Sequence, residues 1–454
     1  MLSVNYNNIV NNYAVSGVNK NSTKVQPSQV SASHVSSPTF SGATGNDISI
    51  RTRLATKEEK AKYNHLTKHL DKDGRKMLDG LLKKGLLLKN DSNDKSTALD
   101  NLYNMVSNPR ATGMDADLLL KHTVKTIYDP FVITQHFGSI PEEYQKDVLD
   151  KVTNGSKDLI TRGIAKSELD NMYSACCVAA SEEFNLASTN PAEFTRFAEG
   201  LTSPAKSVKK SIKLDSLSDK TLDAIWLLNA FEIPYEAKDF NSATLTIAPD
   251  DNAYIREQIQ EKHQGKLERS PIDVLMQSAF MNVGSQQTYN SLNDKHARKF
   301  SNDDRGLIDF EKTFLESVVE DKNITSVTYQ KVNENQQVVG YEADYDTVKN
   351  QLLETLNSGK NIIIGYTMTD ENNYIRGGHE ITIVAAKTDK NGELSFICND
   401  TDDDNPTPIE YPASYLIPKI HHAGIPTDIA EKDLTQTENW VYGVRDFNNN
   451  RVNK

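Results

Sequence analysis

Two adjacent cysteines, Cys176 and Cys177, stand in the stretch SACCVAASEEF, and the chain has only three cysteines in all. A thiol becomes a strong nucleophile when it ionises, and the N-terminus of a helix favours the thiolate. Small residues follow the pair and Ser174 precedes it. We therefore expect a tightly packed helix that begins here, with Ser174 as its N-cap and both thiols in its first turn.

An imidazole that could serve such a thiol is His379, in the stretch YIRGGHEITIVAA. The β-branched residues that follow it predict a strand. Since side chains alternate between the two faces of a strand, His379, Ile381, Ile383 and Ala385 should share one face and Glu380 should point the other way. A histidine that opens a core-facing strand is well placed for a cleft at the end of a sheet.

The strand after His379 leads into a hairpin that could supply a group to orient the imidazole. Asn391-Gly392, in the stretch KTDKNGEL, predicts a tight turn to a strand that ends in SFICND. The second strand of a hairpin ends beside the start of the first, so Asp400 can reach His379 and hold its ring. Asn399 is the alternative orienting residue.

The order cysteine, histidine and acid along the chain resembles the papain-like cysteine peptidase superfamily. The stretches SGKNIIIGYT and GGHEITIVAAKTDKNGELSFICND are most similar to its bacterial bacteriocin-processing branch. The resemblance covers about residues 165–200 and 350–445. It implies an α+β fold with a central helix packed on an antiparallel sheet. It also implies a Cys-His-Asp triad that cleaves peptide or amide bonds through a thioester, with no metal or organic cofactor.

The phase of the predicted helix favours Cys177 over Cys176 as the nucleophile. Positions three, four and seven residues after Cys177 are Ala180, Ser181 and Phe184, whereas position seven after Cys176 is Glu183. A glutamate beneath the site would be costly to desolvate. Cys177 is therefore the predicted nucleophile, and Cys176 stays open as the alternative.

The resemblance also implies an amide side chain six residues before the nucleophile, which donates to the oxyanion. Counting back from Cys177 gives Asn171, and counting back from Cys176 gives Asp170. An ionised carboxylate has no proton to donate, so Asn171 again favours Cys177.

Composition divides the chain into three parts. Residues 1–50 are rich in serine and asparagine and predict a disordered N-terminus. Residues 51–165 show apolar residues at helical spacing and predict a helical accessory domain. Residues 166–454 form the predicted papain-like domain, with an insertion at about 205–345 that carries no recognisable pattern.

The overall composition limits the partners and the compartment. Lysine and arginine number 51 against 63 acidic residues, for a net charge of −12. Nucleic acid and anionic membranes need a basic face, so neither is an expected partner. No apolar stretch is long enough to span a membrane. With three cysteines and no secretory signal pattern, we expect a cytoplasmic protein or one exported without a cleaved signal peptide.

The sequence thus predicts a cysteine peptidase that acts on a protein or peptide substrate. The same triad serves deamidases, transglutaminases and acyltransferases, and the sequence does not separate them. A different class, a catalytically inactive interaction protein such as a secreted effector, also stays open. The distance between the Cys177 sulfur and the His379 ring would distinguish an active from an inactive site.

Overall fold

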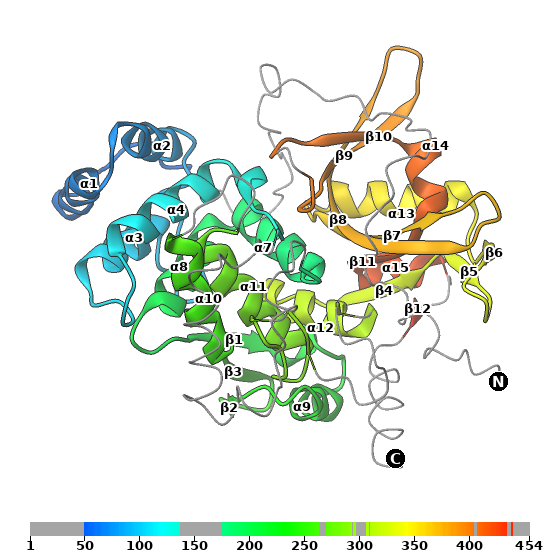
Figure 1. Cartoon of the computed structure of the whole chain (residues 1–454), viewed down its shortest axis with the longest axis horizontal. Coiled ribbons are helices and arrows are strands. Elements are labelled where there is room, and N and C mark those ends of the chain that lie inside the picture. The colour runs from blue at the N-terminus through cyan, green and yellow to red at the C-terminus, as the bar shows by residue number, and fades with distance from the viewer. Residues whose placement is uncertain are drawn as a thin grey trace.

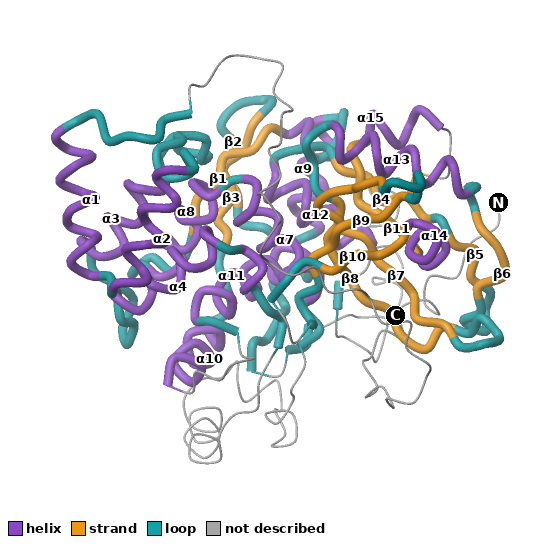
Figure 2. Tube along the Cα trace, turned by 90° about the horizontal axis from the view of Figure 1, so that it is seen from above, coloured by secondary structure: helices purple, strands orange, loops and turns teal. Residues whose placement is uncertain are grey.

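The computed structural model describes residues 50–136, 174–262, 269–292, 294–296, 306–307, 309–403, 406–433 and 437–438. We call the described residues up to 320 the helical lobe and those from 324 the sheet lobe; the two lie side by side in Figures 1 and 2. Of the segment predicted to be disordered, 1–50, residues 1–49 lie outside the described residues, as does Asn171.

The helical lobe combines helices with a small antiparallel sheet in the order β1-β3-β2. Its helices are α1 (Lys57–His69), α2 (Lys72–Lys83), α3 (Ala98–Ser107), α4 (Ala116–Tyr128), α7 (Cys177–Thr189), α8 (Pro191–Thr202), α9 (Thr221–Ala230), α10 (Asp251–Lys262), α11 (Pro271–Gly284) and α12 (Asp309–Glu320). Its strands are β1 (Val208–Lys213), β2 (Tyr235–Ala237) and β3 (Ser242–Ile247).

The sheet lobe is built on a seven-stranded sheet, in the order β10-β9-β8-β7-β11-β4-β12 among the described residues. All of its neighbouring strands are antiparallel, so the molecule has a mixed, α+β architecture. The strands are β4 (Ile324–Thr328), β7 (Ile362–Thr369), β8 (Ile375–Thr388), β9 (Leu394–Asn399), β10 (Ile409–Pro412), β11 (Ile420–Pro426) and β12 (Thr437–Glu438); the hairpin β5 (Gln330–Val332) and β6 (Val338–Tyr341) and the helices α13 (Tyr345–Asn357), α14 (Ala413–Leu416) and α15 (Thr427–Ala430) complete the lobe.

Local sequence explains where several helices begin. Thr56 and Glu59 form a capping box at the start of α1, and Ser270 and Asp273 form another at the start of α11, each side chain accepting from the other's backbone N–H. Pro271 follows Ser270 at the first helical position, where its missing N–H costs nothing.

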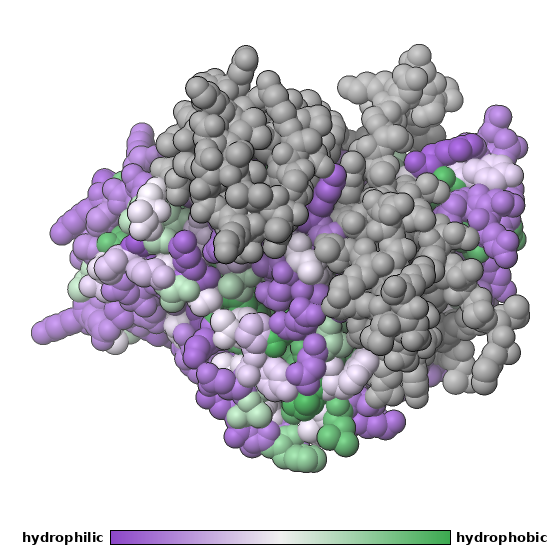
Figure 3. Space-filling view, turned by 60° about the horizontal axis from the view of Figure 1, so that its bottom comes forward, coloured by the Kyte–Doolittle hydropathy of each residue, from purple (hydrophilic) through white to green (hydrophobic). Residues whose placement is uncertain are grey.

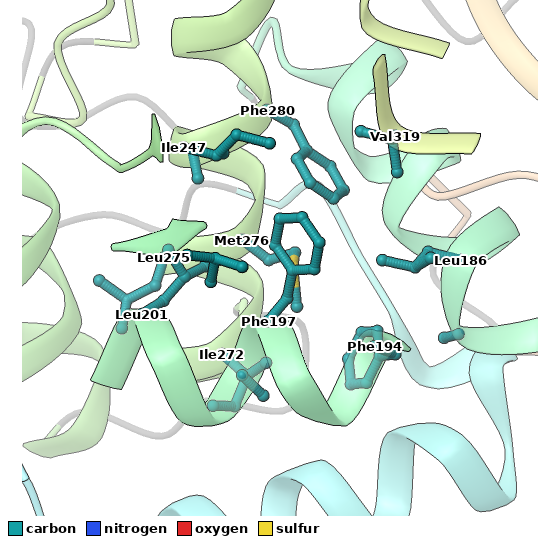
Figure 4. Packing of buried hydrophobic residues seen from close by; sticks show 14 of the residues in the cluster. Leu186, Phe194, Phe197, Leu201, Ile247, Ile272, Leu275, Met276, Phe280 and Val319 are labelled. Carbon is teal, nitrogen blue, oxygen red and sulfur yellow. The ribbon is translucent and has the colours of Figure 1, made fainter. Parts of the chain in front are cut away.

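Each lobe has its own hydrophobic cluster, and the two clusters share no residue. Figure 4 shows the centre of the cluster in the helical lobe, where Phe197 of α8 meets Phe280 of α11 edge to face with ring centroids 5.7 Å apart. Leu186 of α7 and Val319 of α12 close the same cluster. Side chains from α1 to α4 also belong to this cluster, so these helices have no core separate from that of the rest of the helical lobe.

The segment predicted as an insertion, 205–345, supplies elements at the centre of the molecule. It contains α11 and α12, which both pack against α7, and β4 of the large sheet. The boundary predicted at residue 166 lies outside the described residues.

The predicted hairpin after His379 forms, and β8 and β9 pair antiparallel with Thr382 opposite Asn399. Gly392 has a φ of +86°, a conformation that glycine adopts without strain. A register shift lies between Ile383 and Ala385. Ala385 therefore packs against the helical-lobe cluster, and the prediction that it shares a face with Ile381 and Ile383 is wrong.

The surface agrees with the polar composition. Figure 3 shows that the described part of one face is mostly hydrophilic, with hydrophobic side chains confined to small patches. Among the described helices, none combines the length and the hydropathy that crossing a bilayer requires.

Candidate active site

The two adjacent cysteines stand at the start of α7, which is the central helix of the molecule. Residues from Val178 to Ala187 are all buried, because α8, α11, α12 and strand β8 surround the helix. The alanines near its start allow these neighbours to approach closely. Cys176 is the N-cap residue and Cys177 is the first helical residue. The predicted N-cap, Ser174, is wrong, since no side chain caps the helix.

Ser174 has a different role, which is to fix Cys176 in the interior. Its hydroxyl donates to the Gln135 carbonyl at 2.5 Å and lies 2.7 Å from the Cys176 sulfur. The Cys176 thiol is fully buried and also contacts Gln277 Oε1 at 3.1 Å. Burial raises the pKa of this thiol, and the Arg269 guanidinium only partly offsets the effect.

Cys177 is only partly buried, in contrast to its neighbour. Its position at the N-terminus of α7 places it where backbone N–H groups are unpaired by the helix itself and the helix dipole is positive. Of the two candidates, Cys177 is thus the accessible thiol and Cys176 the interior one.

His379 lies in β8 with its ring bonded to Asp400, just beyond the end of β9. His379 Nε2 is 2.7 Å from Asp400 Oδ1, and both side chains are about nine-tenths buried, with 10% and 12% of their area exposed. Asn399, the alternative orienting residue, is buried opposite Thr382 and does not contact the ring through any described hydrogen bond. The structure therefore pairs His379 with Asp400.

The charges around His379 control its protonation. Burial alone would lower the pKa of His379, but the Asp400 carboxylate and, less strongly, a hydrogen bond with Cys177 and the charge of its thiolate raise that pKa well above its ordinary value. In return the imidazolium outweighs burial and lowers the pKa of Asp400. This influence on the pKa indicates that Cys177, from the helical lobe, lies near His379, from the sheet lobe.

Tyr366 covers one side of the imidazole. It stands opposite His379 in the pairing of β7 with β8, and the two rings meet edge to face with centroids 6.0 Å apart. Burial, followed by the charge of Asp400, raises the pKa of the Tyr366 hydroxyl, which therefore stays neutral. The Tyr366 ring thus forms part of the packing around the imidazole of His379.

The reasoning from helix phase needs a correction. Glu183 was expected to be too costly to place beneath the site, yet it is fully buried there and accepts from Gln277 Nε2 at 2.9 Å. Burial and the charge of Asp273 raise the pKa of Glu183 well above its usual range, which favours the neutral form. Since every face of α7 is buried, phase alone does not distinguish the two cysteines.

Gln135 is a residue of the site that the sequence did not reveal. Its backbone N–H donates to the Thr401 carbonyl at 2.9 Å, and its side chain contacts both Thr401 and Asp402. It therefore places a primary amide beside the loop that carries Asp400. No spacing rule connects it with Cys177, because a long segment separates the two along the chain.

The described residues of the site offer no group of side chains arranged for a metal ion. In the described part of the chain, no three histidine, cysteine or carboxylate side chains converge in a way that could hold one. The acidic loop after Asp400 supplies Asp402, whose pKa is raised by burial. The chemistry available to the described residues is that of a thiol, an imidazole and a carboxylate.

Comparison with known proteins gives no relative from which a function could be transferred. No protein-family model, no curated protein and no solved structure matches this chain. A functional assignment therefore depends on the geometry of Cys177, His379 and Asp400.

Proposed function

We propose that this protein is a thiol-dependent hydrolase of the papain-like type, which cleaves peptide or amide bonds with Cys177, His379 and Asp400. The observation that carries the proposal is one imidazole held between a carboxylate and a half-buried thiol at a helix N-terminus. Nucleophilic catalysis at a carbonyl needs these three groups, as nucleophile, general base and orienting group.

In the first half of the proposed reaction, the thiol of Cys177 gives its proton to His379. Asp400 occupies Nε2 of the ring, so Nδ1 is the nitrogen that remains for the thiol. The Cys177 sulfur attacks the carbonyl carbon, and the C=O π electrons move to the oxygen. When the oxyanion collapses, the C–N bond breaks, His379 transfers its proton to the departing amine, and the acyl group stays on Cys177 as a thioester.

In the second half, water replaces the amine. His379 accepts a proton from the water as its oxygen attacks the thioester carbonyl. Collapse of this second oxyanion breaks the C–S bond, releases the carboxylic acid and restores the Cys177 thiolate beside the His379 imidazolium. Asp400 stabilises the imidazolium in both halves.

The start of α7 is the proposed binding position for the oxyanion. The backbone N–H of Cys177 belongs to the first turn, and no side chain caps this helix end. An amide side chain would supply a second donor. Asn171 is the residue predicted for this role, and the amide of Gln135 is a further candidate because it adjoins the Asp400 loop.

The division of the site between two lobes supports the papain-like assignment. The nucleophile opens the central helix of one lobe, whereas the imidazole and the acid come from neighbouring antiparallel strands of the other. Cysteine, histidine and acid also follow each other along the chain in the order that the superfamily resemblance implies.

A limiting pulse of iodoacetamide at pH 6, with adducts mapped by mass spectrometry, tests this function. We expect rapid labelling of Cys177, loss of that label in Cys177→Ala, and labelling slower by about tenfold or more in His379→Ala and Asp400→Asn, since an isolated thiol has a pKa of about 8.5. Cys176→Ala is the matched control and should label like the unaltered protein. Equal, slow labelling of both cysteines in every variant would contradict the proposal.

A further inference from the structure

The interface between the two lobes carries a layer of buried charge. Cys177 belongs to the helical lobe and His379 to the sheet lobe, so the fit between the lobes sets the geometry of the pair. Each lobe has a separate hydrophobic cluster, and Val384, within β8, is the buried residue of the sheet lobe that joins the helical-lobe cluster. Two groups of ionic side chains also lie at this interface, and each group has members in both lobes.

Glu380, the residue after His379, is the centre of the first group. Its carboxylate lies 3.4 Å from Lys312 Nζ on α12 and 2.9 Å from His422 Nε2 on β11. Lys312 is fully buried and also donates to the Ile363 carbonyl of β7 at 3.2 Å. Ser181 of α7 donates to the Glu380 carbonyl at 3.5 Å. Strand β8 is therefore tied to both α12 and α7 one residue from the imidazole.

Lys360, just before β7, is the centre of the second group. Its ammonium lies 3.1 Å from Glu316 Oε2 and 2.6 Å from Glu320 Oε1, both on α12. The Lys360 and Glu316 side chains are almost completely buried, with 2% and 0% of their area exposed. Asn185 of α7 donates to the same Glu320 oxygen at 2.8 Å. The second group thus joins the sheet lobe to the helix that carries Cys177.

Two glycines leave the space that these carboxylates occupy. A Cβ on Gly365 of β7 would collide with His422 and Glu380. A Cβ on Gly424 of β11 would collide with the Glu316 carboxylate. Strand β11 therefore approaches α12 closely at Gly424, where it lacks a side chain, and Glu380 and Glu316 fit directly against the strand backbones at the two glycines.

Buried ion pairs are poor sources of stability but can select one arrangement among several. The cost of desolvating the charges offsets most of their attraction, while breaking a pair leaves a buried charge at a high cost. A small sliding of one lobe on the other would separate Lys312 from Glu380 and Lys360 from Glu316. These ion pairs, which we call the charge layer, therefore oppose such sliding. Apolar contacts of the same area would oppose it far less, because the hydrophobic effect is not directional.

We propose that Lys312, Glu380 and Lys360 are positioning residues, which hold His379 in register with Cys177 across the lobe interface. This inference rests on the proposed function, because it assumes that Cys177 and His379 form a reactive pair. The inference predicts that replacing the charged side chains of this layer with neutral ones slows the reaction of the Cys177 thiol, even in variants that still fold.

The test is the pH profile of Cys177 alkylation in Lys312→Met/Glu380→Gln. This double variant removes both charges, and replacing a whole buried pair is often tolerated by the fold. A thiolate paired with His379 reacts well below pH 8.5, the range of a free thiol. We expect the acid limb of the profile to move upward and the rate at pH 6 to fall about tenfold. A merely structural role would lower the melting temperature without moving the profile.

Lys387→Met/Glu410→Gln is the matched control. It removes the ion pair between Lys387 of β8 and Glu410 of β10. Lys387 is half exposed, and both residues belong to the sheet lobe, so this pair does not cross the interface. It should leave the profile unchanged. If the double variant at the interface does not fold, His422→Gln removes one partner of Glu380 and retains Lys312; the same upward movement, smaller in size, is expected.

Three results would overturn the inference, and they are distinguishable. If the unaltered protein shows no reactive Cys177 at pH 6, the proposed function fails and the positioning role fails with it. The unaltered protein could instead be reactive while Lys312→Met/Glu380→Gln, or His422→Gln in its place, shows the same pH profile of Cys177 alkylation. In that case only the positioning role fails. An equal shift in the control would show a general effect of charge instead of positioning.

Discussion

At the scale of single residues, the environment of each cysteine decides its chemistry. Cys176 is enclosed by Ser174, Gln277 and Arg269, and burial raises its pKa, so it stays a neutral thiol. Cys177 is partly exposed and contributes to the raised pKa of His379. Neighbours in sequence therefore differ because the helix start turns one inward and leaves the other at the surface between the lobes.

The contact of His379 with Asp400 makes stability depend on pH. The pKa of His379 is raised above its unfolded value of about 6.5, so its stabilisation is complete below that pH and is lost as the pH rises through the folded pKa. The pKa of Asp400 is lowered, so its stabilisation is present above about pH 3.9 and is lost as the pH falls through the folded pKa. Both contributions are present between about pH 4 and 6.5.

Asp400→Asn should therefore destabilise the protein more at pH 5.5 than at an alkaline pH where His379 has lost its proton. Urea denaturation of both proteins at the two pH values measures the difference in the free energy of unfolding. The same loss at both values would show that the carboxylate and the imidazolium do not interact as an ion pair.

At the scale of elements, the hairpin of β8 and β9 was the most predictable part of the site. The alternation after His379 and the turn at Asn391-Gly392 depend only on neighbouring residues, so they could be read from the sequence and the hairpin forms as predicted. The start of α7 was less predictable. Ser174 has the right side chain for an N-cap, but its hydroxyl instead donates to the Gln135 carbonyl, a tertiary contact, and contacts the nearby Cys176 sulfur.

Strand β11 offers a test of how closely the sheet must approach α12. In Gly424→Ala the new methyl group would meet the Glu316 carboxylate, and overpacking of this kind costs about 1–3 kcal/mol. We expect the free energy of unfolding, measured by urea denaturation, to fall by that amount. Gly340→Ala, on the hairpin strand β6, is the matched control, because a Cβ there meets no close neighbour; it should lower the free energy of unfolding much less. Gly359 is unsuitable as a control because its positive φ would strain any substitution. Equal effects at 424 and 340 would contradict the close approach.

At the scale of the whole molecule, the sequence predicted the class of fold and missed how its parts combine. In the described part of the predicted helical domain, residues 51–136, helical spacing correctly indicates helices, and their buried faces join the cluster around α7 and α8. The charge layer was hidden because its members are distant in sequence: Lys312, Lys360, Glu380 and His422 come together only in the folded chain. Patterns within one element carry no information on such pairings.

The continuous cluster predicts that the N-terminal helices and α7 unfold together. Leu102 of α3 is fully buried, and Leu102→Ala should cost about 2–5 kcal/mol. In a Cys177→Ala background, the labelling of buried Cys176 reports the opening of the core around α7. We expect circular dichroism and Cys176 labelling to move to lower temperature together. An early transition seen by circular dichroism alone would mean that helices α1 to α4 unfold separately.

The central claim is that Cys177 carries the acyl group, and acid-quenched mass spectrometry after incubation with p-nitrophenyl acetate tests it most directly. The account predicts an acetyl thioester on Cys177 in the unaltered protein and in Cys176→Ala, a much slower acetylation in His379→Ala, and none at this position in Cys177→Ala. Acetylation confined to Cys176, or a Cys177 that is acetylated no faster in the unaltered protein than in His379→Ala, would contradict it.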